Sequence, residues 1–214
     1  MRKICLVLAL AGSLGLIGCN SGPAEDQAPV IRTGQDFEAE LAECQRLSQD
    51  ILLKVDLGQT PSAAELDQLK KAEKKFQGLI AFRPEVPGLH LGLGRIHQVF
   101  SRHEDAIKEF SQGADYIVDL KQEDAKRLVA EFHFQAANSY AALFQFKSSA
   151  EQATKALSYY PDNAKFLTAA AGAYIQLNEP NRAKLMLQKA LKSDPHPPKA
   201  EQLMKLLESG AKKP

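Results

Sequence analysis

Residues 155–161 read KALSYYP and residues 189–195 read KALKSDP, so a Lys-Ala-Leu run and the Pro that follows it return after 34 residues. Tyr140 returns as Tyr174 with the same displacement. A fixed period of this length is the sequence signature of a helical solenoid, in which each unit is a pair of helices that cannot bury its apolar face alone. The repeat therefore predicts the architecture of this chain more sharply than its binding partner.

The composition is that of a globular protein. The 214 residues are 44% hydrophobic and 25% charged, which supports a core of ordinary size and argues against disorder and against a polytopic membrane protein. The 27 basic residues balance 26 acidic ones. The chain therefore lacks the excess of basic charge that nucleic-acid binding requires, so we expect no nucleic-acid partner.

Residues 1–18 have the organisation of an export signal. Arg2 and Lys3 provide a positive start, and the apolar run that follows is too short to span a bilayer comfortably. Residues 16–19 read LIGC and resemble the bacterial lipobox, which implies that Cys19 becomes the lipidated first residue of a mature lipoprotein. The alternatives are a conventionally cleaved signal with an incidental cysteine, or an uncleaved anchor.

A lipid on Cys19 implies a membrane as one partner of this protein. Acyl chains such as palmitate contribute about 0.8 kcal/mol per buried CH₂, so the two or three chains of a bacterial lipoprotein anchor it stably. Asn20 is not the Asp that resembles an inner-membrane retention signal. We therefore expect a location on the outer membrane of a diderm bacterium, facing the periplasm.

Two segments outside the repeats lack the pattern of a folded domain. Residues 19–34 show no helical or strand period and are rich in chain breakers, which predicts a flexible tether behind the lipidated cysteine. Residues 210–214 are predicted to be a disordered tail. The folded domain is expected to cover residues 35–209.

Apolar residues at three-and-four spacing run through this domain, and no stretch alternates β-branched residues as a strand would. Thr60 and Pro61 look like the cap and first turn of the second helix. We therefore expect an all-α fold. The predicted helices cover residues 35–56, 61–82, 87–101, 104–120, 124–144, 147–160, 163–177, 181–193 and 197–209.

The spacing resembles the tetratricopeptide repeat, whose first helix carries a bulky residue, Leu, Gly and Tyr, and whose second carries Ala, an aromatic residue and a final Pro. Leu93, Gly94, Ala106 and Phe110 fill these slots in one unit, although Val118 replaces the Pro. The clear units are residues 87–120, 130–163 and 164–197, and residues 53–86 form a degenerate one. The resemblance implies a right-handed helix-pair solenoid with about three clear repeats, a degenerate N-terminal helix pair and a C-terminal capping helix.

One interval in the chain departs from the period. Leu93 and Ala136 occupy the same slot but lie 43 residues apart, so nine residues are inserted between the second and third units. We expect the insertion to lengthen the helices around Gln122 to Leu128, because Val118 stands where a Pro would stop the helix.

Residue types that perform catalysis or bind metals do not cluster in this sequence. His90, His97 and His133 occupy slots for large packing residues, so we interpret them as core, with metal binding or acid–base work as the weaker alternative. Cys44 lies on an apolar stripe, which favours a buried thiol over a reactive one. The glycine-rich residues 88–94 lack the preceding strand and the Lys-Ser/Thr ending of a phosphate loop. We expect no cofactor, no metal and no catalytic residue.

The family resemblance also implies which side chains line the concave groove, where such solenoids bind an extended or helical segment of a partner. These residues are Leu91, Arg95, Gln98, Val99, Phe134, Asn138, Lys165, Thr168, Ile175 and Gln176. We therefore predict a non-enzymatic, lipid-anchored periplasmic scaffold that mediates protein–protein interactions in envelope assembly. A structural homo-oligomer of the cell envelope is the alternative, and a small enzyme ranks third.

Overall fold

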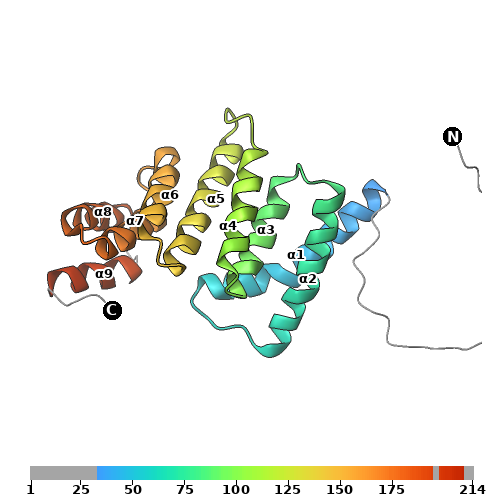
Figure 1. Cartoon of the computed structure of the whole chain (residues 1–214), viewed down its shortest axis with the longest axis horizontal. Helices are drawn as coiled ribbons and strands as arrows, with labels where there is room; N and C mark the ends of the chain where they lie inside the picture. The colour runs from blue at the N-terminus through green and yellow to red at the C-terminus, as the bar shows by residue number, and fades with distance from the viewer. Residues whose placement is uncertain (1–32, 195–197, 210–214) are drawn as a thin grey trace, which may run out of the picture.

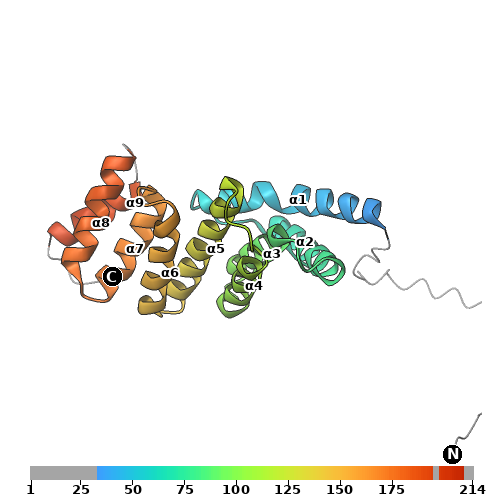
Figure 2. The same cartoon turned by 90° about the horizontal axis from the view of Figure 1, so that it is seen from above.

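The computed structural model describes residues 33–194 and 198–209. Within these residues the chain forms helices and no strand, which confirms the all-α prediction. The helices are α1 (Gly34–Asp56), α2 (Ala63–Phe82), α3 (Pro87–Val99), α4 (His103–Asp115), α5 (Glu123–Ala142), α6 (Phe146–Tyr159), α7 (Ala164–Gln176), α8 (Pro180–Ser193) and α9 (Pro198–Glu208). They follow one another along the long axis of the molecule in four successive pairs, and α9 packs against α7 and α8 (Figure 1). Figure 2 shows the same elongated stack from above.

The same tight turn joins the two helices in each of the last three pairs. Ser101, Phe144 and Asn178 all adopt the left-handed conformation, with φ of 57°, 59° and 59°. In each turn the next backbone N–H donates at 2.9 Å to the carbonyl five residues earlier, in the pairs Arg102–His97, Gln145–Tyr140 and Glu179–Tyr174. Because the three turn positions lie 43 and 34 residues apart, the structure confirms both the period and the insertion.

The structure bears out one part of the prediction for the insertion and corrects another. The predicted helix over residues 104–120 is too long, because α4 ends at Asp115 and a loop follows. In that loop the Tyr116 ring stacks on His90, and the Asp119 carboxylate accepts a 2.9 Å hydrogen bond from the Lys121 N–H. The insertion also lengthens α5, as expected around Gln122 to Leu128, because α5 has 20 residues where α7 has 13.

The start of α2 is also corrected. Ser62 caps this helix, and not Thr60 followed by Pro61. The Ser62 hydroxyl accepts from the Glu65 N–H at 3.3 Å, while the Glu65 carboxylate accepts from the Ser62 N–H at 2.8 Å. This reciprocal capping box satisfies two backbone donors that the helix itself leaves unpaired.

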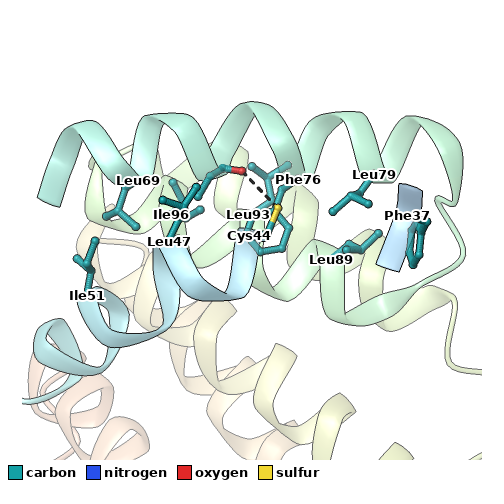
Figure 3. Close-up of a cluster of buried hydrophobic side chains, with 11 residues drawn as sticks. Phe37, Cys44, Leu47, Ile51, Leu69, Phe76, Leu79, Leu89, Leu93 and Ile96 are labelled. Carbon is teal, nitrogen blue, oxygen red and sulfur yellow. Dashed lines mark hydrogen bonds between the residues drawn. The ribbon is translucent and has the colours of Figure 1, made fainter. Parts of the chain in front are cut away.

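The first two helix pairs share a core of large side chains (Figure 3). Phe37 on α1, Phe76 and Leu79 on α2, and Leu89 on α3 are buried together with other aliphatic residues. Helices α1 and α2 run antiparallel, so Cys44 meets Ala72 at the middle of the pair. The degenerate N-terminal unit therefore packs as a helix pair.

The C-terminal core combines alanines with larger aliphatic side chains. Ala171 on α7, Ala183 and Ala190 on α8, and Ala200 on α9 are all fully buried. Close helix crossings need small residues, which is why the repeat places alanine in these slots. Met204 on α9 completes this cluster, so the last helix caps the stack as predicted.

Two glycines of α3 serve the same purpose. A Cβ atom on Gly94 would lie 2.3 Å from the Phe110 ring, and one on Gly92 would lie 2.6 Å from the Phe76 ring. These distances are too short for any side chain. The glycines allow α3 to approach its neighbours, which agrees with the prediction that they form no phosphate loop.

Candidate functional site

The first helices of the pairs form the inner face of the solenoid. Helices α1, α3, α5, α7 and α9 each contact the next helix of this set, whereas within the described residues the second helices α2, α4, α6 and α8 do not contact one another. Since neighbouring units are closer on one side, the stack curves toward that side. All ten predicted groove residues lie on α3, α5 or α7 of this inner face.

Gln98 on α3 is used to join two units. Its side-chain amide donates to the Gln135 carbonyl and to the Ser139 hydroxyl of α5, both at 2.9 Å. Ser139 is fully buried. Gln98 therefore lies on the inner face as predicted, but its donor is committed to the packing between repeats.

Arg95 is held by the end of α1. Its Nη2 donates to the Asp56 carboxylate at 2.7 Å and to the Leu52 carbonyl at 3.2 Å. Its side chain is 23% exposed. A cation beside the last carbonyls of a helix also complements the helix dipole, so Arg95 stabilises the junction of α1 and α3 and is not a free groove residue.

Three apolar groove residues are half-buried between the units. Leu91 packs against the cluster of Phe110 and Phe132, and Val99 packs against the N-terminal core. Phe134 on α5 lies against Phe166 on α7, with ring centroids 5.2 Å apart. Each still presents part of its surface on the inner face.

At the C-terminal end, the predicted groove is largely closed. Thr168 is 7% exposed, and its hydroxyl donates to the Ala164 carbonyl of its own helix. Ile175 is 8% exposed because Ala200 and Met204 of α9 lie in the same core cluster. The expectation that these two side chains line an open groove is wrong, since both are buried and the capping helix packs against Ile175. Gln176 is half-buried.

Lys165 and Asn138 are the groove residues that keep free polar groups. Lys165 is exposed at the start of α7, and Asn138 is half-buried in the middle of α5. Within the described part of the chain, neither side chain makes a hydrogen bond or an ion pair. They are the polar groups of the inner face that remain available to a ligand.

A cavity of about 530 Å³ lies beside Lys165, and sequence reasoning missed it. Arg127 and Glu131 line it from the extended part of α5, and Tyr160 lines it from the connection to α7. The Tyr160 hydroxyl donates to the Glu123 carboxylate at 2.6 Å, and this bond raises the pKa of Tyr160. Arg127 was visible in the sequence as a basic residue of the insertion. Its place beside Lys165 depends on how the insertion folds, which the sequence did not show.

The histidines pack in the core, as predicted, and two of them repeat the same arrangement. His90 bonds to Glu109 and His133 to Gln152, in each case through Nδ1 at 2.8 Å across 19 residues of sequence. Burial alone would lower the pKa of His90, but hydrogen bonds to Glu109 and to the Pro84 carbonyl raise it. Burial lowers the pKa of His133. These ring nitrogens therefore fix the crossing of the two helices in each pair.

Cys44 is fully buried and its thiol faces the Ala72 carbonyl (Figure 3). Burial raises the pKa of the thiol to about 12. This confirms the buried thiol, because a reactive cysteine needs a low pKa and access to solvent. Among the described residues, no group of three His, Cys, Asp or Glu side chains could hold a metal ion.

The predicted signal, the lipidation site at Cys19 and most of the tether lie outside the described residues, as does the tail over residues 210–214. In the part of the chain that is described, no helix combines the length and the apolar character needed to cross a bilayer. The lipid anchor therefore stays a prediction.

Residues 140–207 match the family model of the tetratricopeptide repeat. No curated protein matches the sequence. Among solved structures, the chain is similar to the APC/C hetero-tetramer Cut9-Hcn1, with a TM-score of 0.62, 18% identity and coverage of 81% of this chain and 32% of that chain. It is also similar to MamA (TM-score 0.58, 15% identity, 67% of this chain and 79% of that one) and to the Hsp90 co-chaperone Cns1 from Saccharomyces cerevisiae (TM-score 0.53, 20% identity, 59% and 39%).

These matches support a tetratricopeptide-repeat protein, and the solenoid described above is of that kind. At identities this low the similar structures show the fold alone, and the chain spans only about a third of the first of them. Stacks of this repeat are typically non-enzymatic scaffolds for protein–protein interaction. This architecture suggests an interaction scaffold, in which the surface of the solenoid must specify the partner.

Proposed function

We propose that this protein is a non-enzymatic, lipid-anchored scaffold of the bacterial cell envelope, which holds a segment of a partner protein on the inner face of α5 and α7. The observation that carries the proposal is the amide of Asn138, which is half-buried and makes no hydrogen bond within the described chain. This amide is accessible to water, and a ligand that pairs with both its donor and its acceptor can replace that water. Its orientation toward the inner face favours a partner there.

The neighbouring side chains fit a peptide. Phe134 offers a half-buried aromatic surface between α5 and α7, and Lys165 offers an unpaired cation next to it. An amide can bond to both the N–H and the carbonyl of an extended main chain, while the ring takes an apolar side chain. A peptide with an acidic residue beyond that apolar side chain would complete the pairing with Lys165.

The closed parts of the groove limit the length of the segment. Arg95 and Gln98 are bonded to neighbouring helices, Thr168 is buried, and α9 covers Ile175. The proposed site is therefore shorter than a groove that runs along all the repeats. A short segment of the partner suffices to fill it.

Membrane attachment through Cys19 supports a role in the envelope. The lipobox-like residues 16–19 and the tether after them would hold the solenoid within tens of ångströms of the bilayer, on the outer membrane and facing the periplasm. A scaffold in this place can recruit other envelope proteins to the membrane. The partner and the assembly process are not specified by these residues.

Site-specific photocrosslinking in intact cells would test the binding site. A photoreactive residue at position 138 or 165 should crosslink to the same partner, and the same residue at Lys108 on the outer helix α4 should not. Asn138→Ala together with Lys165→Ala should abolish the crosslink formed from position 134. A partner that crosslinks only from Lys108 would place binding on the outer face and overturn the proposal.

The anchor is tested separately. Cys19→Ser should release the protein from membranes or stall its processing, and mass spectrometry of the wild type should find acyl chains on the mature N-terminus. An unmodified N-terminus in a protein that partitions into the aqueous phase would contradict the lipid anchor. That result would leave the peptide site unaffected.

A further inference from the structure

The charge of this chain is divided along the solenoid. Residues 33–142 contain 13 basic and 18 acidic residues, whereas residues 143–214 contain 11 basic and 6 acidic ones. The near-neutral total therefore hides an acidic N-terminal part and a basic C-terminal part. In an elongated stack the two parts lie at opposite ends (Figure 1).

The basic charges of the C-terminal part are not neutralised within the chain. Among the described residues the lysines from α6 onward make no ion pair, and Arg182 pairs with Glu179 at 2.9 Å. These unpaired lysines are Lys147, Lys155, Lys165, Lys184, Lys189, Lys192, Lys199 and Lys205. A surface of this kind favours an acidic partner.

A groove of about 600 Å³ lies within this basic region, on the outer side between α6 and α8. Its apolar side chains include Ala150, Tyr174 and Leu177, and the Arg182 guanidinium lies over the Tyr174 ring at 5.5 Å. Lys147 and Lys155 line the groove without an ion pair, and the Glu151 carboxylate lies between them on the same helix. Because Glu179 pairs with Arg182, the groove offers an apolar surface with one more cation than anions.

The complementary surface lies at the end of α1. Leu53 and Leu57 are 56% and 69% exposed, which is unusual for leucines on a helix whose next-door residues Ile51 and Leu52 are buried. Asp50 is exposed one helical turn before Leu53. Lys54, the cation in this segment, is bonded to Glu65 of α2. The end of α1 is therefore an apolar and acidic projection, held in place by the bond between Arg95 and Asp56.

We propose that the projection formed by Asp50, Leu53 and Leu57 of one copy docks into the groove between α6 and α8 of a second copy. The leucines would cover the apolar side chains of the groove, and the Asp50 carboxylate would face Lys147 and Lys155. The two surfaces lie on different parts of the molecule, so the contact is head-to-tail and each copy keeps one surface free. The result is a chain of copies, and the inner face of α5 and α7 takes no part in it.

Complementation between two variants tests this contact with the full chain, purified with two different affinity tags. Lys147→Glu with Lys155→Glu disables the groove, and Leu53→Ser with Leu57→Ser disables the projection. Each variant alone should lose self-association at least about tenfold, since like charges or lost apolar contact across an interface cost more than 1.4 kcal/mol. Mixing the two variants should restore association, but only to a dimer, because one intact groove meets one intact projection.

A matched control and the salt dependence complete the test. Lys199→Glu with Lys205→Glu changes the same charge on α9, outside the groove, and should leave association near the wild-type level. Raising the ionic strength to about 1 M, where the Debye length is near 3 Å, should weaken the wild-type contact. A wild-type chain that remains monomeric, or a mixture of variants that fails to form dimers, would overturn the inference. Neither result bears on the peptide site, whose crosslinks come from positions 134, 138 and 165.

Discussion

The N-terminal and C-terminal halves of this solenoid are held together by different means. In the first two pairs, ion pairs connect separate helices, as between Arg95 and Asp56 or between the Arg102 guanidinium and the Glu73 carboxylate. In the last two pairs the ion pairs each join residues three apart at the start of one helix: Lys126 with Glu123, Arg127 with Asp124, and Arg182 with Glu179. The buried cores also differ, because the first contains two phenylalanines and a single alanine, whereas the last contains four alanines and no aromatic residue.

This difference follows the regularity of the repeat. From residue 140 onward the sequence matches the family model, and small residues at each crossing allow the helices to pack closely. The first pair departs from the repeat, and there the chain adds specific pairs between helices. Partly buried pairs contribute more than exposed ones, because solvent screens them less.

The largest effect should come from the aromatic packing of the N-terminal half. Phe110 is 1% exposed and fills the space beside Gly94. Phe110→Ala should lower the free energy of unfolding by about 3–5 kcal/mol, through lost transfer energy and a cavity. Phe144→Ala is the control, since Phe144 is 80% exposed. Chemical denaturation measures both, and equal losses would show that burial does not decide the cost.

A smaller effect is expected from the ion pair between α2 and the start of α4. The Glu73 carboxylate accepts hydrogen bonds from Nη1 and Nη2 of Arg102, at 2.7 and 2.8 Å, and the Glu73 side chain is 13% exposed. Glu73→Ala should cost about 1.5–3 kcal/mol, as expected for hydrogen bonds to charged groups. A double-mutant cycle with Arg102→Ala should show coupling that is absent from the exposed pair of Arg182 and Glu179 in the C-terminal half. Equal coupling in both pairs would remove the contrast between the halves.

The bond between His90 and Glu109 should make stability depend on pH. The pKa of His90 is raised in the folded chain, so the bond contributes fully below the ordinary histidine pKa of about 6.5 and is lost as the pH rises through the raised value. The melting temperature of the wild type should therefore exceed that of Glu109→Gln by more at pH 6 than at pH 9. His133, whose pKa is lowered by burial, has the opposite sign and cancels in this difference. Burial lowers the pKa of His97, but the Glu109 charge raises it, so removing that charge acts on His97 in the same direction as on His90. A difference that does not change with pH would mean that His90 is neutral in the folded chain.

The smallest effect is expected on the lysines of α8. Lys184 and Lys192 are exposed and make no ion pair within the described residues. Replacing both with Ala should change the free energy of unfolding by no more than about 0.5 kcal/mol per site. A larger loss in thermal unfolding would mean that these lysines stabilise the fold, and it would weaken the view that they face a partner.

The helix face on which most groove residues lie could be predicted from the sequence. Whether those side chains are accessible to a ligand could not. Leu91, Phe134 and Asn138 lie on the predicted face because helical spacing decides the face of a residue locally. Arg95 and Ile175 have the same spacing, yet the first is bonded to α1 and the second is covered by α9. Exposure depends on the neighbouring unit, which the residue's own repeat does not describe.

The period, the helix pairs, the buried histidines and the buried Cys44 were all determined by the sequence alone, because each depends on residue types at fixed local spacing. Only the tertiary structure decided that α4 ends at Asp115 and leaves a loop, which inner side chains stay free, and that the end of α1 exposes Leu53 and Leu57. Those features depend on contacts between segments that lie far apart in the chain. A repeat specifies how each unit meets an ideal neighbour, and the ends and interruptions of the stack have no such neighbour.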